Sequence, residues 1–194
     1  MRDWKELQKE LQSEMKPKRY EHTLGVRYTA AALAMVHDCD LEQAQLAGLL
    51  HDCAKGYDDQ KMLCLCEQYH LELSEAEQKN FSLLHAKVGA KVARDKYLIE
   101  DEMVLQAIRY HTTGRKEMSK LEQIIFLADY IEPNRKMLPG LPLCRKLAFE
   151  DLDLAMYQVL KNVLEYLQTK GEPVDDTSRE AFLYYEQITR EKRD

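Results

Sequence analysis

The hydrophobic residues of this chain recur at intervals of three and four along most of its length. Trp4, Leu7 and Leu11 have this spacing near the start, and Pro17 ends or restarts that first helix. Alternation of apolar and polar residues, which would indicate strands, is almost absent. Further helices are predicted over 18–37, from 40 through 50, near 58–69, 82–97 and 101–111, from 119 along the apolar run 124–127, and over 150–169 and 178–191. The pattern therefore predicts an all-α protein.

Polar pairs mark the beginnings of several of these helices. A Ser, Thr or Asp followed three residues later by Glu or Gln can cap a helix start with its side chain. Such pairs are Asp40 with Gln43, Ser74 with Glu77, Ser119 with Glu122 and Thr177 with Glu180. The segment 132–142 contains three prolines and a glycine, which predicts a loop after the helix that Ser119 opens.

The length and composition favour one globular domain. The chain has 194 residues, of which 45% are hydrophobic and 32% charged, which is ordinary for a folded protein. Only seven glycines and five prolines occur, as expected for long helices with short connections. We therefore predict a single helical bundle over residues 1–194. Its core would lie at about 18–135, with C-terminal helices in 143–191 packed on it and the first and last helices peripheral.

The charge balance limits the partners that this protein can have. A formal charge of −6 argues against a broad surface for nucleic acid, which needs clustered Lys and Arg. A phosphate-rich small molecule remains a suitable ligand, provided that local cations or metal ions supply the field.

Cysteine usage and hydropathy indicate the compartment. The five cysteines are odd in number and irregularly spaced, and the charged N-terminus is no export signal. The longest nearly apolar stretch, residues 29–36, is too short to cross a bilayer. The sequence therefore predicts a cytoplasmic protein with reduced thiols and no membrane partner.

The dipeptide His-Asp occurs twice, and its two contexts differ. His37-Asp38 falls at a helix end before the next cap, where the helix dipole favours histidine and turn chemistry favours aspartate. His51-Asp52 follows the apolar run 46–50 and precedes Lys55. Burying such polar groups is costly unless they pair or hold a metal. Only the second dipeptide is a candidate site.

Four more potential ligands lie beside apolar residues on separate helices. His22, His85, His111 and Asp129 each adjoin residues that should face a core. A helical bundle can bring such side chains to one point. Imidazoles and carboxylates suit Fe, Mn or Zn better than Mg or Ca. Together with His51 and Asp52 the set numbers six, which is too many for one hydrolytic metal with an open position but suits two metals that share a carboxylate.

The ordered set resembles the HD-domain superfamily of metal-dependent phosphohydrolases, and in particular its bacterial YqeK family. The stretches that carry this resemblance are Tyr20-Glu21-His22-Thr23-Leu24-Gly25-Val26, Gly48-Leu49-Leu50-His51-Asp52-Cys53-Ala54-Lys55, His85-Ala86, Ile108-Arg109-Tyr110-His111-Thr112-Thr113-Gly114 and Ala128-Asp129-Tyr130-Ile131-Glu132-Pro133-Asn134-Arg135. They are spread over most of the chain, and no ligand position is missing. The resemblance implies a single HD domain.

The resemblance also implies an activity and a metal centre. It implies a di-iron hydrolase that splits diadenosine tetraphosphate symmetrically into two ADP, with a metal-activated hydroxide attacking an inner phosphate. One iron would be held by His22, His51, Asp52 and Asp129, and the second by His85 and His111, with Asp52 bridging the two. Because the same ligands accept Mn, Co or Zn, iron is the expected but not the required metal.

Further residues are candidates for substrate contact. Lys55 follows Asp52 by three residues, so it would share a helix face with it and could contact a phosphate, or else it is a helix C-terminal lysine before Gly56. The resemblance favours a catalytic role. The other candidates, each equally compatible with plain surface or core, are Arg27, Thr112, Thr113, Arg115, Lys116, Tyr130 and Arg135.

Other functions remain compatible with the same ligands. A nucleotidase or phosphodiesterase acting on another nucleotide could use this scaffold, because fold and metal do not choose a substrate. A nucleotide-binding protein with a structural metal and a helical bundle without metal are the non-enzymatic alternatives. Exposed hydrophobic residues on the terminal helices could form a homodimer interface or cover the core.

Overall fold

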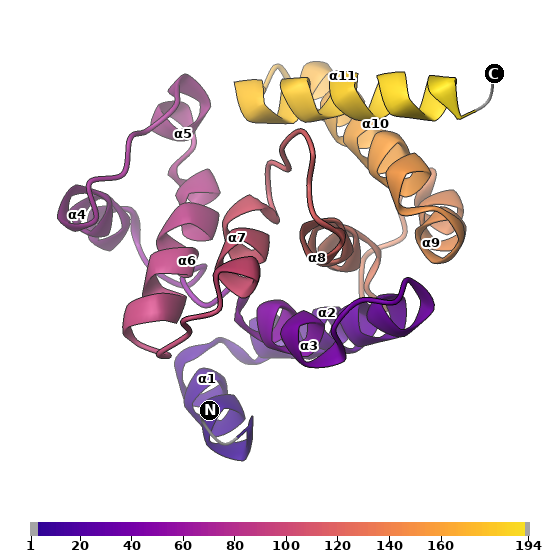
Figure 1. Ribbon diagram of the computed structural model, residues 1–194. Coiled ribbons are helices and arrows are strands. Elements are labelled where there is room, and N and C mark those ends of the chain that lie inside the picture. Colours follow the sequence, from indigo (N-terminus) through magenta and orange to yellow (C-terminus); the bar gives the residue numbers. More distant parts are fainter. Residues whose placement is uncertain (1–3, 193–194) are drawn as a thin grey trace.

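Helices make up nearly all of the regular structure (Figure 1). The computed structural model describes residues 4–192, and no strand occurs among them. The elements are α1 (Trp4–Glu14), α2 (Pro17–Val36), α3 (Leu41–Leu50), α4 (Asp59–Gln68), α5 (Glu75–Lys79), the 3-10 turn η1 (Phe81–Leu83), α6 (Leu84–Asp95), α7 (Glu102–Tyr110), α8 (Lys120–Ile131), α9 (Leu141–Glu150), α10 (Leu152–Lys170) and α11 (Asp176–Glu191). The predicted all-α fold is confirmed.

Three of the four predicted side-chain caps open helices. The carboxylate of Asp40 accepts a hydrogen bond from the backbone N–H of Gln43, at 2.8 Å. Full capping boxes open α5 at Ser74 and α8 at Ser119. The predicted cap at Thr177 is wrong. Asp175 caps α11 instead, two residues earlier, and its carboxylate accepts from the N–H of Thr177.

The loop after α8 is shorter than the predicted segment 132–142. Gly140 has a φ of +81°, a conformation that favours glycine, and α9 begins at the next residue. Pro142 therefore lies in the first turn of a helix rather than in the loop. A proline is tolerated there because the first N–H groups of a helix have no partner within it. This short helix was not predicted as a separate element.

Helix α8 runs through the middle of the bundle. It packs against α2, α3, α7 and α10, and Figure 1 shows it between the α2–α3 pair and α10. Apolar residues cover its whole circumference, and Ile124, Ile125, Leu127 and Ala128 are fully buried. The backbone of Asp129, the next residue, therefore lies near the centre of the molecule.

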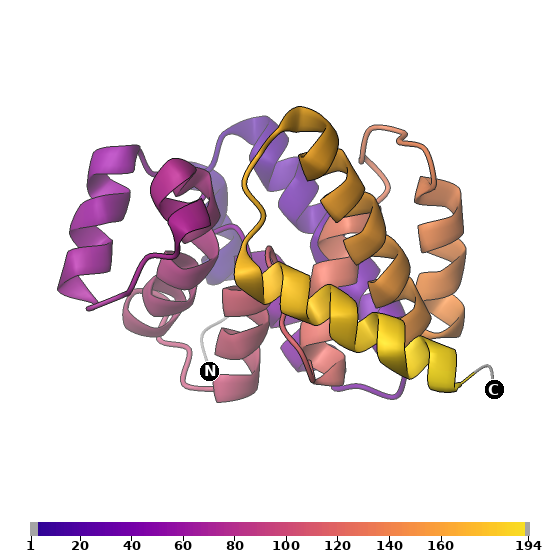
Figure 2. The same ribbon diagram turned by 90° about the horizontal axis from the view of Figure 1, so that it is seen from above.

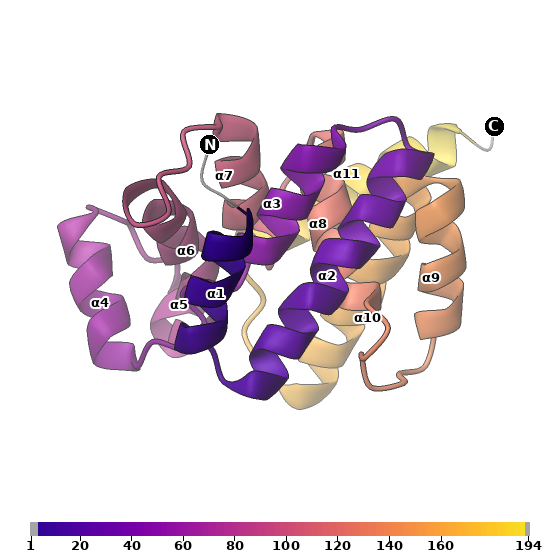
Figure 3. The same ribbon diagram turned by 90° about the horizontal axis from the view of Figure 1, so that it is seen from below.

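The terminal helices lie at the edges of the bundle and still bury side chains. Figure 3 shows α1 lying beside α2, to whose start it is joined, and Leu7 and Leu11 of α1 are buried. Figure 2 shows α11 lying across α10. Tyr185 of α11 is fully buried, and its hydroxyl accepts a hydrogen bond from the amide of Gln123 in α8, at 3.0 Å. Within residues 4–192, no helix has the length and hydrophobicity needed to cross a membrane.

Candidate metal centre

Five helices bring the six predicted ligands to one place. His22 lies in α2, His85 in α6 and Asp129 in α8. His51 and Asp52 follow the last residue of α3 directly, and His111 follows the last residue of α7. His51, Asp52, His85 and His111 are buried, and the Asp129 side chain is 27% exposed. The group therefore has one open side.

The carboxylate of Asp52 lies between two pairs of histidines. Its Oδ2 atom is 3.4 Å from His51 Nε2 and 3.8 Å from His22 Nε2. Its Oδ1 atom is 3.2 Å from His85 Nε2 and 3.7 Å from His111 Nε2. Each oxygen thus faces a different pair, which is the arrangement that a carboxylate bridging two metal ions requires.

Asp129 completes the first of these two groups. Its Oδ1 atom lies 3.0 Å from His22 Nε2 and 3.9 Å from His51 Nε2. One potential ligand atom from each of His22, His51 and Asp129 lies within 4.8 Å of the other two. Four side chains therefore surround one position, and two histidines with a shared carboxylate surround the other.

Hydrogen bonds orient the histidine rings toward the centre. The Nδ1 atoms of His51 and His111 bond the carbonyls of Gly48 and Ile108, at 2.8 and 2.7 Å, and His85 Nδ1 faces the Ser82 carbonyl. Because a carbonyl only accepts, each Nδ1 must carry the hydrogen. This leaves the Nε2 lone pairs free to bind a metal.

Two of the inward-facing nitrogens lack a hydrogen-bond partner, and this observation tests whether a cation fits the centre. The Nε2 atoms of His22 and His51 are buried and make no hydrogen bond. The Nε2 atoms of His85 and His111 lie 3.1 Å apart, so two lone pairs face each other. Unpaired buried polar atoms are costly, and a divalent cation at each position would satisfy them. The residues fit a metal centre with nitrogen and oxygen ligands.

The electrostatics of the group also suit metal ligation. Burial raises the pKa of Asp52, but the electrostatic influence of His51, His111 and His85 around the carboxylate outweighs it and holds that pKa well below the usual range. Burial, in contrast, is the main reason that the pKa of His85 falls to about 4. At neutral pH the carboxylate is therefore charged and His85 is neutral, the forms that bind metal.

Glu132 supports the ligand His22 and was not singled out from the sequence. Its side chain is 2% exposed, and its Oε1 atom lies 3.2 Å from His22 Nδ1. The backbone N–H of Asn134 donates to Oε2 at 2.7 Å. A methyl group at Gly25 would lie only 2.5 Å from that Oε2 atom. The sequence signal for such a partner was Gly25, which follows the ligand His22 by three residues and so shares a helix face with it. A glycine there leaves room for a side chain from another element beside the histidine.

Replacing Gly25 by Ala is expected to weaken metal binding about tenfold to a hundredfold. The new methyl group would displace Glu132, and loss of such an outer partner typically costs that much affinity. Competition with a chelator measures the change. Gly56→Ala is the matched control, since a methyl group there meets nothing within 4 Å. Equal metal affinity in the two variants would contradict a supporting role for Glu132.

Lys55 lies beside the second histidine pair. Its Nζ atom is 3.1 Å from His85 Nδ1 and 3.3 Å from the Ser82 carbonyl oxygen. Burial lowers the pKa of Lys55. The predicted helical position is wrong, because α3 ends at Leu50 and residues 51–56 form turns. The backbone N–H of Lys55 donates to the carbonyl oxygen of Asp52, so the two residues still lie close together in the same turn.

Arg19 was not predicted, yet it contacts the central carboxylate. Its Nη1 atom lies 2.6 Å from Asp52 Oδ2, and its side chain is 40% exposed. A cavity of about 310 Å³ adjoins this contact and is lined by Lys16, Arg19 and Lys55 as well as Asp52. Three cationic side chains therefore gather beside the histidine cluster, although the protein as a whole is acidic.

The predicted substrate residues of the 112–116 loop have different environments. The hydroxyl of Thr112 lies 3.3 Å from His85 Nε2 and 3.2 Å from His111 Nε2, so Thr112 belongs to the centre. Thr113 donates to the carbonyl of Gly114. Arg115 binds both carboxylate oxygens of buried Glu122, at 2.7 and 2.8 Å. Lys116 contributes its carbonyl to Arg115.

The remaining candidates lie apart from the ligands. Arg27 donates to Gln45 and packs over the ring of Trp4, which ties α2 to α3 and α1. Tyr130 and Arg135 line a separate cavity beyond the end of α8. Substrate contact by these residues stays a prediction.

The other His-Asp dipeptide, His37-Asp38, has a structural role. His37 Nε2 bonds the carbonyl oxygen of Ala148 at 2.7 Å, and Asp38 occupies a turn position with a φ of +51°. Both features agree with the sequence argument that context, rather than the dipeptide itself, distinguishes the site.

Comparisons with known proteins agree with this geometry. Residues 19–134 match the HD domain model. The chain belongs to the HD domain family, which makes it a metal-dependent hydrolase by class. It is 46% identical over 158 residues to a symmetrical bis(5'-nucleosyl)-tetraphosphatase of Halalkalibacterium halodurans, covering 80% of this chain and 82% of that protein. A protein of the same name from Staphylococcus aureus is 40% identical over 170 residues, covering 87% of each.

A solved structure extends the likeness to the whole fold. The crystal structure of a "predicted HD superfamily hydrolase involved in NAD metabolism" from Clostridium acetobutylicum superposes with a TM-score of 0.92 at 39% identity. The match covers 98% of this chain and 99% of that one, so it includes the C-terminal helices as well as the HD domain.

Proposed function

We propose that this protein hydrolyses diadenosine tetraphosphate symmetrically into two molecules of ADP. The observation that carries the proposal is the position of Asp52, with each carboxylate oxygen facing a different histidine pair. A centre for two metal ions suits displacement at phosphorus. The names of the two relatives described above support a bis(5'-nucleosyl) tetraphosphate as the substrate class.

The proposed centre holds two divalent metals, with iron expected and Mn, Co or Zn as substitutes. His22, His51, Asp52 and Asp129 would hold one ion, and His85 and His111 would hold the other with Asp52 shared. When bound, such ions lower the pKa of water and neutralise charge on phosphate oxygens. Thr112 adds a hydroxyl next to the second position.

The protein's own cations would bind the phosphate chain. Lys16, Arg19 and Lys55 line the cavity beside Asp52 and can offset the charge that develops on phosphate oxygens. Lys55 is the candidate catalytic cation because burial strengthens its field and it also touches His85.

We further propose that the chain acts as one domain in the cytoplasm, on a small-molecule substrate. Gln123 of the HD region binds Tyr185 of α11, which supports a single folded unit. The five cysteines are unpaired, as in a reducing compartment.

Product analysis tests the proposed reaction. Protein purified with iron or manganese should convert diadenosine tetraphosphate to ADP alone. In ¹⁸O-water, half of the ADP molecules should carry the label, because water adds to one of the two products. Formation of AMP and ATP would contradict symmetrical cleavage. Hydrolysis of other nucleotides, with no hydrolysis of diadenosine tetraphosphate, would favour the alternative that the protein is an HD nucleotidase or phosphodiesterase.

A further inference from the structure

Arg145 of α9 binds the end of α8 through several hydrogen bonds. Its Nε atom donates to the carbonyl oxygen of Ile131 at 3.0 Å, and its Nη2 atom donates to that of Glu132 at 2.9 Å. The same Nη2 atom lies 3.5 Å from the carbonyl oxygen of Pro133. One guanidinium group therefore holds three consecutive carbonyl groups, although α9 lies outside residues 19–134, which match the HD domain model.

The carbonyl groups at this place need such a partner. The last C=O groups of a helix have no hydrogen-bond donor within it, and α8 ends at Ile131. The chain leaves the helix at Glu132, whose φ and ψ are −50° and 153°. The planar guanidinium group has several donors in a fixed arrangement, so it can bind carbonyls on both sides of this turn. Arg145 therefore fixes the backbone conformation with which the chain leaves α8.

The residue at this turn supports a metal ligand. The Glu132 side chain is buried, and its Oε1 atom lies 3.2 Å from Nδ1 of His22. Asp129, which is itself a candidate ligand, lies within α8, whereas Glu132 follows the last residue of that helix. The position of the Glu132 carboxylate therefore depends on the turn that Arg145 binds, and not on the helix alone.

We infer that Arg145 is a positioning residue for the metal centre. By holding the turn at Glu132, Arg145 keeps the carboxylate against Nδ1 of His22. The ring of His22 then keeps its Nε2 atom directed toward Asp129, 3.0 Å away. The inference rests on the proposed metal centre but not on the proposed substrate. It gives α9, which follows the HD region, a part in metal binding.

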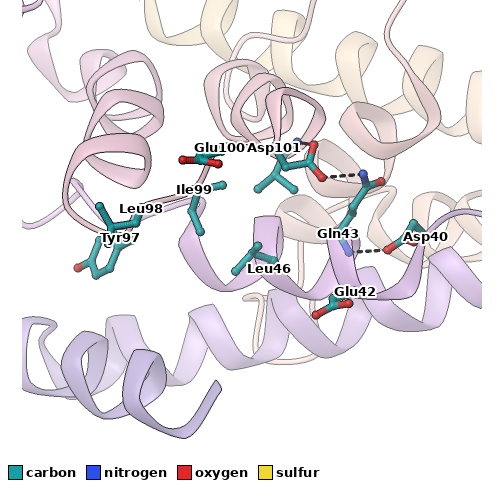
Figure 4. Close-up of a pocket in the computed structure, with 10 residues that line it drawn as sticks. Asp40, Glu42, Gln43, Leu46, Tyr97, Leu98, Ile99, Glu100 and Asp101 are labelled. Atoms are coloured by element: carbon teal, nitrogen blue, oxygen red, sulfur yellow. Dashed lines mark hydrogen bonds between the residues drawn. The ribbon is translucent and has the colours of Figure 1, made fainter. Parts of the chain in front are cut away.

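Another group of carboxylates lines a cavity of about 440 Å³ between the start of α3 and the α6–α7 connection (Figure 4). They belong to Asp40, Glu42, Glu100 and Asp101. Asp40 and Asp101 already accept hydrogen bonds from Gln43, through its backbone N–H and its side-chain amide. None of the described residues that line this cavity is a histidine, so metal ions that prefer imidazole should bind at the histidine centre instead. Metal binding by the whole protein therefore reports on that centre.

Arg145→Met tests the inference through metal affinity. The substitution keeps an apolar stem and removes the donors, so the affinity for one of the two metal ions should fall about tenfold, as when an outer partner of a histidine ligand is lost. Competition between the full chain and a chelator for Mn²⁺ measures the change. Arg145→Lys keeps the charge but not the planar fork, so its loss should be smaller. Lys146→Met is the matched control and should bind metal like the original protein, because Lys146 is the next residue of α9 and its side chain is 69% exposed.

A double variant shows whether Arg145 acts through Glu132. Glu132→Ala removes the carboxylate that Arg145 positions, so adding Arg145→Met to it should lower the metal affinity no further. Circular dichroism checks that each variant is folded. A lower melting temperature of Arg145→Met with unchanged metal affinity would show a merely structural role and overturn the inference, as would an equal further loss in the Glu132→Ala background. Either result would leave the metal centre intact, whereas failure of the original protein to bind metal would refute the centre and the inference together.

Discussion

Asp52→Asn should lower kcat/KM for diadenosine tetraphosphate by about a thousandfold or more. Both oxygens of Asp52 face histidine pairs, so the substitution removes a charged ligand from two positions at once. Lewis-acid stabilisation of this kind contributes several kcal/mol, and each 1.36 kcal/mol is tenfold in rate. The loss should exceed the roughly tenfold to hundredfold cost of removing an outer partner such as Glu132. Steady-state kinetics with a fixed metal supply measures it.

The chain contains its own control for this experiment. Asp38→Asn makes the same change in the other His-Asp dipeptide, and asparagine tolerates the positive φ of that turn. This variant should retain full activity. Retained activity in Asp52→Asn, or an equal loss in both variants, would exclude the bridging role of Asp52.

Among the six clustered residues, His51 and Asp129 were predicted because their neighbours are apolar, whereas His22 lies between Glu21 and Thr23. His51 follows Leu49 and Leu50, and Asp129 follows Ala128, all of which are fully buried. A polar residue that continues a buried run must point into the molecule, and several such residues in a small bundle must meet. Local pattern was therefore enough to find these residues.

Arg19 and Glu132 could not be found in this way. Arg19 is separated from Asp52 by 33 residues, and Glu132 from His22 by 110 residues. Neither continues an apolar run, so nothing local distinguishes Arg19 from other surface cations or Glu132 from other loop carboxylates. The contact of Arg19 follows from the packing of α2 against α3, and that of Glu132 from the packing of α2 against α8. Sequence spacing alone gives neither.

Helix boundaries show the same division. The caps at Asp40, Ser74 and Ser119 depend on residues three apart and were predicted correctly. The start of α9 depends on Gly140, whose left-handed conformation brings it close to Asn162 of α10. The prolines of that segment indicate a loop, and Asn162 lies 22 residues further along the chain than Gly140.

The strongest test of a two-metal centre is to substitute the ligands of one metal position and leave the ligands of the other position intact. The original protein, purified without oxygen, should contain two metal ions per chain. His85→Ala and His111→Ala should each contain about one, because both histidines face Oδ1 of Asp52 while the first group remains intact. Activity should fall by at least about a hundredfold, since displacement would lose the clamp on one phosphate oxygen.

His37→Ala is the control for this pair of variants. Its ring bonds only the Ala148 carbonyl among the contacts of the described residues, so two metals should remain, with stability lower by about 1 kcal/mol. Circular dichroism checks that each variant is folded. If His111→Ala lost both metals while staying folded, or kept both, the assignment of His85 and His111 to a separate second position would be wrong. Loss of one metal by both variants would support a centre in which His85 and His111, beside Oδ1 of Asp52, hold the second ion.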